Sequence, residues 1–270
     1  KSFEVIPALI SIDQVRELKT SKLTEEGYWS IGAGVPLSDV ESLAKTYAPA
    51  LERMLRFFGA RQIKNRGTLG GNLCTASPIG DTPPVLLALN ARLKLASASG
   101  TRVVAIDDFF IGYRQTDLRP KELLVAIEIP LSAPDGERHQ RAFKVSKRQE
   151  LDISSISAAY SIVIKNGLVT EARLAYGGMA ATPLRAKKAE EALIGQAWNG
   201  ESIESALAAL SEDFSPITDH RASAWYRMEV AQNLLRGLWL EVSQGAPERL
   251  PYRPSSTIHL SGTQAQGVTL

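Results

Sequence analysis

The chain has 270 residues, of which 44% are hydrophobic and 22% charged, a composition typical of one large or two modest globular domains. Its 31 Lys and Arg residues nearly balance 29 Asp and Glu residues, leaving a net charge of +2. This excludes the basic excess of a nucleic-acid-binding protein, and no apolar run approaches the roughly 20 residues that a membrane span needs. The single cysteine, Cys74, excludes an internal disulfide framework and indicates a reducing compartment, the cytoplasm.

The same cysteine count excludes a four-thiolate iron–sulfur cluster or zinc site built from this chain alone. The three histidines, His139, His220 and His259, are scattered and complete no metal-ligand spacing. The sequence therefore predicts no metal site, and any redox chemistry would use an organic cofactor or another chain.

Strands and turns are expected in the first half of the chain. The opening, Lys1-Ser2-Phe3-Glu4, has no methionine and no long apolar signal core, so we expect a cut or processed N-terminus. Residues 93–95 and 103–106 are predicted as strands that form a hairpin around Ser99-Gly100. Strands are predicted over residues 3–10, 28–33, 93–95, 103–106 and 123–129.

Helices are expected around a glycine-rich segment. Ser38 and Glu41 have the S-x-x-E spacing of a capping box with Ser38 as N-cap, and apolar residues follow at the spacing of one helical face. A second helix over residues 50–58 would stop at the following glycine. A third would enter through Pro83 and Pro84, because a missing backbone N–H costs little in the first turn.

A change of pattern near residue 138 predicts a second domain. Two strand-like runs, 155–164 and 168–176, flank Asn166-Gly167, a dipeptide that strongly favours a hairpin. Strands followed by helices are typical of an α+β fold, here an antiparallel sheet with helices on one face. Helices are predicted over residues 186–194, 202–211 and 224–242. We predict domains over residues 1–135 and 138–242, followed by a tail over residues 243–270.

Residues 67–81, GTLGGNLCTASPIGD, are polar, glycine-rich and without periodicity. Glycines let a backbone approach a ligand closely, and Thr68, Asn72 and Thr75 add short polar side chains. Asp81 precedes the predicted helix and would either cap it or accept hydrogen bonds from ligand hydroxyls. A turn-rich loop without a ligand explains the same residues equally well. The spacing matches neither G-x-G-x-x-G nor G-x-x-x-x-G-K-[ST], so a Rossmann-type site is not supported.

The segment RQIKNRGTLGGNLCTASPIGDTPPVLLAL resembles the central flavin-binding segment of the molybdenum hydroxylases. Residues 107–130, 142–154 and 174–193 resemble later segments of that family in the expected order. The closest likeness is to the FAD-carrying small subunit of bacterial xanthine dehydrogenase, and it covers most of residues 28–242. The resemblance implies an α+β protein with an FAD-binding domain of the vanillyl-alcohol-oxidase type, N-terminal part missing, followed by the family's C-terminal flavoprotein domain.

The resemblance also implies roles for individual residues. Asp81 would accept hydrogen bonds from FAD hydroxyls, and Lys144 would lie near the isoalloxazine and stabilise negative charge on the reduced ring. Beyond that tuning, no catalytic residue is expected in this chain, and Tyr113 would lie where nicotinamide docks. The residues implied to bind FAD are Phe58, Thr68, Gly70, Gly71, Asn72, Thr75, Asp81, Leu124 and Lys144.

Each role has a structural alternative. Phe58 and Leu124 have the character of core residues, and a strand lysine such as Lys144 faces solvent by default. Tyr113 with its neighbouring arginine would then be an ordinary surface pair. Cys74 is interpreted as a small buried filler, because no histidine lies nearby in the sequence to activate a nucleophile. Arg148, Glu150 and Asp152 are interpreted as a solvated charge cluster.

Members of the family carry a further glycine-rich loop around the FAD pyrophosphate, and Lys1 begins just after the place where that loop would end. We therefore expect the diphosphate contacts to come from a separate chain or a missing fragment, which would meet Lys1 near residues 67–81. Arg61, Lys64 and Arg66 are the nearby cations that would otherwise have to serve. The implied partners are a chain with iron–sulfur clusters and the N-terminal FAD segment, and a large molybdopterin-binding subunit.

The implied function is that of a xanthine dehydrogenase-like flavoprotein component in purine metabolism. Electrons from 2Fe-2S clusters would reach FAD, and reduced flavin would pass hydride to NAD+. Two alternatives stay open. One is the flavoprotein subunit of a carbon monoxide or nicotinate dehydrogenase type of enzyme, and the other is an assembly subunit of the hetero-oligomer that holds no flavin.

Overall fold

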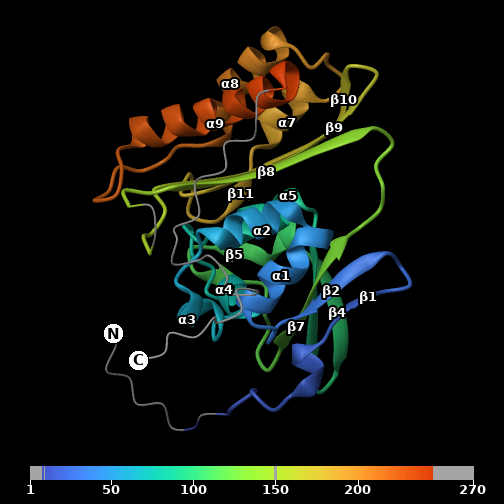
Figure 1. Ribbon diagram of the computed structural model, residues 1–270. Helices are drawn as coiled ribbons and strands as arrows, with labels where there is room; N and C mark the ends of the chain where they lie inside the picture. The colour runs from blue at the N-terminus through green and yellow to red at the C-terminus, as the bar shows by residue number, and fades with distance from the viewer. Residues whose placement is uncertain (1–7, 9, 149–150, 246–270) are drawn as a thin grey trace, which may run out of the picture.

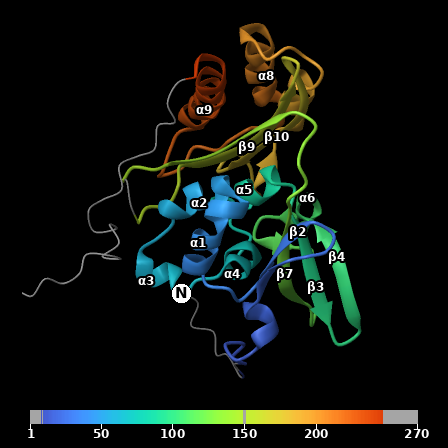
Figure 2. The same cartoon turned by 45° about the vertical axis from the view of Figure 1, so that its right-hand side comes forward.

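The computed structural model describes residues 8, 10–148 and 151–245. Figure 1 shows four layers, which are, from bottom to top, a first sheet, a layer of helices, a second sheet and a second layer of helices. The same order is visible after the rotation of Figure 2. Among the described helices, none combines the length and the apolar character that crossing a membrane requires.

The first sheet has the strand order β1-β2-β7-β3-β4, and all neighbours are antiparallel. The short 3-10 helix η1 (Arg16–Lys19) packs beside β2 and β7. Alternation along the strands turns Trp29, Ile31 and Ile127 into the core under the helices. The strands are β1 (Ser21–Leu23), β2 (Tyr28–Gly32), β3 (Arg92–Ser97), β4 (Gly100–Ala105) and β7 (Leu123–Pro130).

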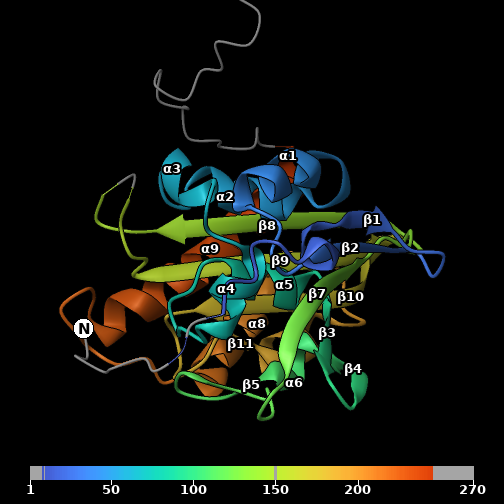
Figure 3. The same ribbon diagram turned by 90° about the horizontal axis from the view of Figure 1, so that it is seen from below.

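The first helical layer lies between the two sheets. Helices α1 and α2 pack against each other, and α2 and α5 also contact the second sheet. Figure 3 shows α2 beside β8 from below. The helices are α1 (Leu37–Tyr47), α2 (Pro49–Arg56), α3 (Arg61–Lys64), α4 (Leu69–Cys74), α5 (Thr82–Ala88) and α6 (Ile106–Phe109), and a small hairpin of β5 (Phe110–Gly112) and β6 (Gln115–Thr116) follows α6.

The second sheet is antiparallel in the order β11-β10-β9-β8, so that β8 forms one edge. Asn166 and Gly167 both have positive φ, +52° and +78°, as a two-residue hairpin with a type I′ turn requires. Helices α7, α8 and α9 cover the outer face. The elements are β8 (Glu137–Val145), β9 (Ile156–Lys165), β10 (Leu168–Gly177), β11 (Leu184–Arg185), α7 (Lys187–Leu193), α8 (Gly200–Asp213) and α9 (Ala224–Gln244).

A row of alanines sets the distance between the second sheet and the first helical layer. Ala142 of β8 pairs with Ala159 of β9, which pairs with Ala175 of β10. All three are buried in the hydrophobic cluster that contains the buried side chains of α2 and α5. Since alanine ends at Cβ, the helices can lie close to the strands. The opposite face carries large side chains, such as Tyr160 and Tyr176, which pack toward α7–α9.

The structure confirms the α+β fold, the hairpins at Ser99-Gly100 and Asn166-Gly167, and the three C-terminal helices. The capping box at Ser38 was wrong, because α1 begins at Leu37 after Pro36 and no side chain caps it. Glu41 instead pairs with Lys64.

Other sequence predictions lie partly or wholly outside the described residues. The strand predicted over residues 3–10 falls on residues 1–7 and 9, which are not described, and residues 8 and 10 are not in a strand. Of the predicted tail, 246–270 lie outside the described residues. Several elements were not anticipated, among them β8, whose charged residues hide its alternation, and α4, whose glycines are poor helix formers.

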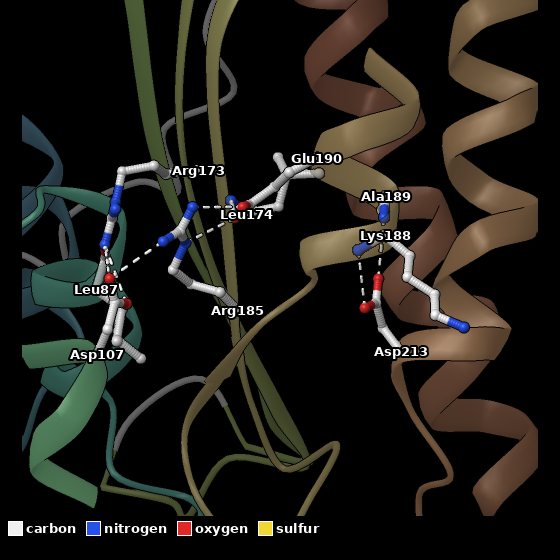
Figure 4. Close-up of polar contacts among 9 residues, drawn as sticks. All are labelled: Leu87, Asp107, Arg173, Leu174, Arg185, Lys188, Ala189, Glu190 and Asp213. Carbon is white, nitrogen blue, oxygen red and sulfur yellow. Dashed lines mark hydrogen bonds and ion pairs between the residues drawn. The ribbon is translucent and has the colours of Figure 1, made fainter. Parts of the chain in front are cut away.

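A chain of ionic contacts crosses from the first helical layer to the second sheet (Figure 4). Arg173 of β10 donates to the Leu87 carbonyl oxygen of α5 (2.8 Å) and to the Asp107 carboxylate of α6 (2.8 and 3.1 Å). Arg185 joins Asp107 (3.1 Å) to the buried Glu190 carboxylate of α7. Desolvation lowers the pKa of Arg173, and Asp107 opposes that shift. Asp107 is therefore the acid that compensates two partly buried arginines.

We expect Asp107→Asn to reduce the free energy of unfolding by about 2 kcal/mol, because hydrogen bonds to charged groups contribute roughly 1.5–3 kcal/mol. Asp108→Asn is the matched control, since Asp108 lies in the same turn of α6 but is exposed, and it should change stability by less than about 0.5 kcal/mol. Urea unfolding at constant m-value measures both. Equal stability of the two variants would contradict a structural role for Asp107.

Candidate functional site

The glycine-rich segment folds into a loop, the short helix α4 and a second loop. Thr68 is the N-cap of α4, and its Oγ1 accepts a hydrogen bond from the Gly71 N–H (3.0 Å). Gly70 lies so close to β2 that a Cβ would meet the Ala33 Cβ at 2.7 Å. Glycine is therefore required at residue 70 for packing. The backbone of Gly71 is exposed, and a Cβ there would meet only Thr68 Oγ1 within 4 Å.

Polar side chains tie α4 to α5. The Asn72 amide oxygen accepts a hydrogen bond from the hydroxyl of Thr82, at 2.6 Å, and Thr82 is fully buried. Thr75 donates to the Gly71 carbonyl oxygen at 2.9 Å and is otherwise exposed. Thr68, Gly70, Gly71, Asn72 and Thr75 therefore lie on the short helix α4 and its two cap positions, where the sequence predicted an irregular loop.

Asp81 does not cap α5 with its side chain, so the capping interpretation was wrong. One carboxylate oxygen accepts a hydrogen bond from Lys144 Nζ and the other from the Ser154 hydroxyl, both at 2.5 Å. The side chains of Asp81 and Lys144 are only 8% and 6% exposed. The alternative expectation, that Lys144 faces solvent as strand lysines usually do, was therefore also wrong.

Strand register explains why Lys144 reaches Asp81. Lys144 pairs with Ser157 and Ser157 with Gly177, two residues along each strand from the alanine row. Because side chains alternate between faces, this row points toward α5 as the alanines do. At Gly177 a Cβ would lie 2.5 Å from Ser157 Oγ and 3.4 Å from the Gly80 carbonyl oxygen. A glycine here allows the sheet to approach the residue before Asp81.

The two predicted apolar contacts lie in or beside the core. Leu124 of β7 is 6% exposed and belongs to the main hydrophobic cluster, and its strand contacts α4. Phe58 follows α2 and is partly buried against the same cluster. Leu124 therefore lies beneath the candidate site, whereas Phe58 keeps a partly accessible ring.

Tyr113 lies apart from the Asp81 contacts, in the turn between β5 and β6. Its side chain is 61% exposed, and the Arg114 guanidinium lies 5.9 Å from the ring centroid. Its ring is thus available to a partner or ligand, while none of its described contacts joins it to residues 67–81.

The three nearby cations are not equivalent. Lys64 is buried and donates to Glu41 (2.6 Å) and to the Leu55 carbonyl oxygen (3.0 Å), so it is committed to the fold. Arg61 is exposed, and Arg66 has only a 3.9 Å contact with Asp13. Of these three cations, Arg61 and Arg66 are therefore the candidates to offer charge to a ligand beside residues 67–81.

The remaining candidates concern reactivity and metals. Cys74 is exposed, so the buried-filler interpretation was wrong. Desolvation by the surrounding protein still raises the pKa of its thiol to about 11, so it is protonated near neutral pH and a poor nucleophile.

Arg148 pairs with Asp152 at 3.4 Å on the surface, and Glu150 lies outside the described residues. Within 8, 10–148 and 151–245, no three metal-ligating side chains are grouped to hold an ion.

Sequence reasoning missed Ser154 and the second glycine pair. Ser154 is buried and donates to Asp81, and the Gly178 N–H donates to the Pro78 carbonyl oxygen at 2.7 Å. In the sequence Gly177-Gly178 indicates only the end of a strand ladder, whereas the structure gives Gly178 a positive φ (+85°), a conformation that favours glycine. Both contacts join residues more than 70 positions apart, which no local pattern reveals.

Comparison with known proteins matches both halves of the chain. Residues 1–132 match the FAD binding domain in molybdopterin dehydrogenase, and residues 141–242 match the CO dehydrogenase flavoprotein C-terminal domain. The glyceraldehyde dehydrogenase medium chain of Sulfolobus acidocaldarius is 35% identical over 237 residues, covering 87% of this chain and 83% of that one.

Other similar proteins are longer enzymes and solved complexes. Xanthine dehydrogenase/oxidase of Gallus gallus is 37% identical over 227 residues, which are 78% of this chain but only 16% of that protein. A structure of carbon monoxide dehydrogenase from Hydrogenophaga pseudoflava matches with a TM-score of 0.78 and 29% identity, covering 84% of this chain and 78% of the other. With its FAD-binding and flavoprotein C-terminal domains, the chain belongs to the FAD-binding subunits of the molybdenum hydroxylases.

Proposed function

We propose that this chain holds FAD against residues 68–81 and Lys144 in a xanthine dehydrogenase-like complex, and that NAD+ docks at Tyr113. Residues 1–135 would form the cofactor domain, and residues 138–242 would supply Lys144 and Ser154. These residues would hold FAD, and the chemistry that FAD would supply when bound is electron transfer from iron–sulfur clusters and hydride transfer to NAD+. The observation that carries the proposal is the buried Asp81 carboxylate at the open glycine segment.

The residues present fit such a cofactor. An ionised carboxylate has about four acceptor positions, and Lys144 and Ser154 occupy two at Asp81. The other two acceptor positions have no hydrogen-bond partner among the described residues, and ligand hydroxyls would occupy them. Gly71 and Thr75 are exposed residues of the same segment, and a Cβ at Gly71 would meet only Thr68 Oγ1 within 4 Å.

This chain's residues bind, orient and charge-balance rather than exchange protons. Lys144 remains beside Asp81 on a rigid strand, so its ammonium is held at a fixed position within the site. Phe58, half-buried at the end of α2, offers a flat apolar surface for a ring. The arrangement is suited to holding and tuning a bound ring system.

A second candidate function concerns the substrate oxidised elsewhere in the complex. The match to a glyceraldehyde dehydrogenase medium chain covers 83% of that subunit, whereas the xanthine dehydrogenase match covers 16% of a much longer protein. This favours an aldehyde-oxidising complex as the alternative. Purifying the complex and comparing xanthine with glyceraldehyde as reductants of the flavin separates the two.

Asp81→Ala should lower stability as well as FAD affinity, because removing one partner of a buried ion pair costs about 3–5 kcal/mol. In Asp81→Ala/Lys144→Met the stability should recover, since replacing both partners is often nearly neutral. FAD should nevertheless bind about tenfold or more weakly, because a lost charged acceptor costs roughly 1.5–3 kcal/mol. Flavin absorbance after gel filtration and thermal unfolding measure the two effects.

The double variant distinguishes a ligand-binding role of Asp81 from a purely structural one. A stable double variant with full flavin occupancy would mean that Asp81 and Lys144 only join the two domains. Absence of flavin absorbance from the purified wild-type complex would favour the flavin-free assembly subunit.

Tyr113→Ala should lower kcat/KM for NAD+ by about tenfold, because the nicotinamide would lose a flat partner worth on the order of 1 kcal/mol or more. Reduction of the flavin by the upstream substrate should be unchanged, since those electrons arrive by another route. Ile111→Ala is the matched control, because Ile111 is equally exposed (63%) on the same hairpin. Stopped-flow kinetics separate the half-reactions, and equal losses in both would remove Tyr113 from the NAD+ site.

A further inference from the structure

Arg227 lies in the first turn of α9 and is 1% exposed. Its Nη1 donates to the carbonyl oxygens of Ser155 and Gly178, the latter at 3.0 Å. Its Nη2 donates to Asp219 Oδ1 at 2.9 Å. One guanidinium therefore joins the segment that leads into β9 to the segment that leaves β10.

Each of these two segments holds the loop before α5. Ser154, adjacent to Ser155, donates to Asp81, and the Gly178 N–H donates to the Pro78 carbonyl oxygen. At Gly178 (φ +85°) a Cβ would lie 2.6 Å from the Ser155 carbonyl oxygen and 2.8 Å from Arg227 Nη1. Glycine at residue 178 is thus needed for the arginine to reach both carbonyls.

The loop before α9 fixes the guanidinium from its other side. The Arg221 and Ala222 N–H groups donate to Asp219 Oδ1 at 2.9 and 3.1 Å. Desolvation raises the pKa of Asp219, but these N–H groups and Arg227 outweigh it and hold the pKa at about 2. The Asp219 carboxylate is therefore ionised throughout the neutral range. Ser155 also donates to the Arg221 carbonyl oxygen, at 3.5 Å.

Stability alone is a poor explanation for this arrangement. A buried ion pair often contributes no more than well-packed apolar side chains of similar volume. Among the described residues, the buried Nε of Arg227 has no hydrogen-bond partner, which adds a cost. A planar guanidinium does, however, fix two carbonyl oxygens at once, which a hydrophobic side chain cannot do.

We propose that Arg227 is a positioning residue of the cofactor site, which sets the placement of Pro78 and Asp81 through Gly178 and Ser154. This inference rests on the proposed function, since it assigns the residue to the FAD site. Arg227 touches neither the glycine segment nor any group proposed to contact the cofactor. It acts through two backbone segments.

The test compares Arg227→Met and Arg227→Lys with Arg236→Met in the purified complex. Arg236 is an exposed arginine of the same helix, paired with Glu204. FAD titration of flavin-depleted protein gives Kd, and visible circular dichroism reports the environment of the bound flavin. Arg227→Met should raise Kd by about tenfold or more, as losses of supporting residues behind ligand contacts do, and should alter the flavin spectrum. Arg227→Lys should retain part of the affinity, and Arg236→Met all of it.

A folded Arg227→Met protein with wild-type Kd and flavin spectrum would overturn the inference and leave the proposed function intact. If wild type and Arg236→Met also fail to bind FAD, both proposals fall. Should Arg227→Met not fold, Asp219→Asn gives the milder disturbance of the same contact and should raise Kd in the same direction. Wild-type affinity in that variant would count against Arg227.

A double-mutant cycle that combines Arg227→Met with Ser154→Ala tests whether Arg227 acts through the segment that carries Ser154. Because Arg227 is proposed to act through the segment that carries Ser154, the two increases in Kd should be less than multiplicative in the double variant. Fully multiplicative effects would show that Arg227 acts elsewhere and would overturn the inference.

Discussion

Helix α5 is held against the second sheet by a charged contact at each end, and the candidate site depends on this placement. Asp81 meets Lys144 before the first turn, and Arg173 donates to Leu87 in the last turn. Between them the alanine row lets the helix lie close to the strands. A seven-residue helix has little stability of its own, so these contacts determine where it lies. Both charges also match the helix dipole, with the carboxylate at the N-terminus and the guanidinium at the C-terminus.

This placement gives the glycine-rich segment a fixed shape. Gly70 packs on Ala33, which directly follows β2, Asn72 accepts from Thr82 of α5, and Asp81 meets the second sheet. Glycines give a chain conformational freedom that folding must remove. In residues 67–81 these three contacts restrict the backbone, while Gly71 stays exposed to solvent. A ligand bound there would meet donors and acceptors already in place, which lowers the entropic cost of binding.

Much of the fold could be predicted from local patterns, but the tertiary contacts of the site could not. Asn166-Gly167 and the apolar runs on either side specify a hairpin by themselves. The residue types of the loop pointed to Asp81 as a candidate, and the family resemblance implied both Asp81 and Lys144. That these two would pair with each other depends on strand register and on the alanine row. The role of Arg227 depends on a helix start, a loop and two strand ends meeting, and nothing in the residues around it indicates that.

Asp81 is shared between the contact that joins the two halves of the chain and the proposed ligand contact, and this sharing has a consequence for stability. Lys144 and Ser154 come from the C-terminal half, whereas Asp81 comes from the N-terminal half. In the proposed function the cofactor lies against both Asp81 of the N-terminal half and Lys144 of the C-terminal half, so its full set of contacts forms only when the halves are joined. Linkage then requires that it stabilise the joined arrangement by RT ln(1 + [L]/Kd). The proposed function therefore couples cofactor binding to the association of the two halves through the Asp81 carboxylate, and the role proposed for Arg227 would support the C-terminal side of that contact.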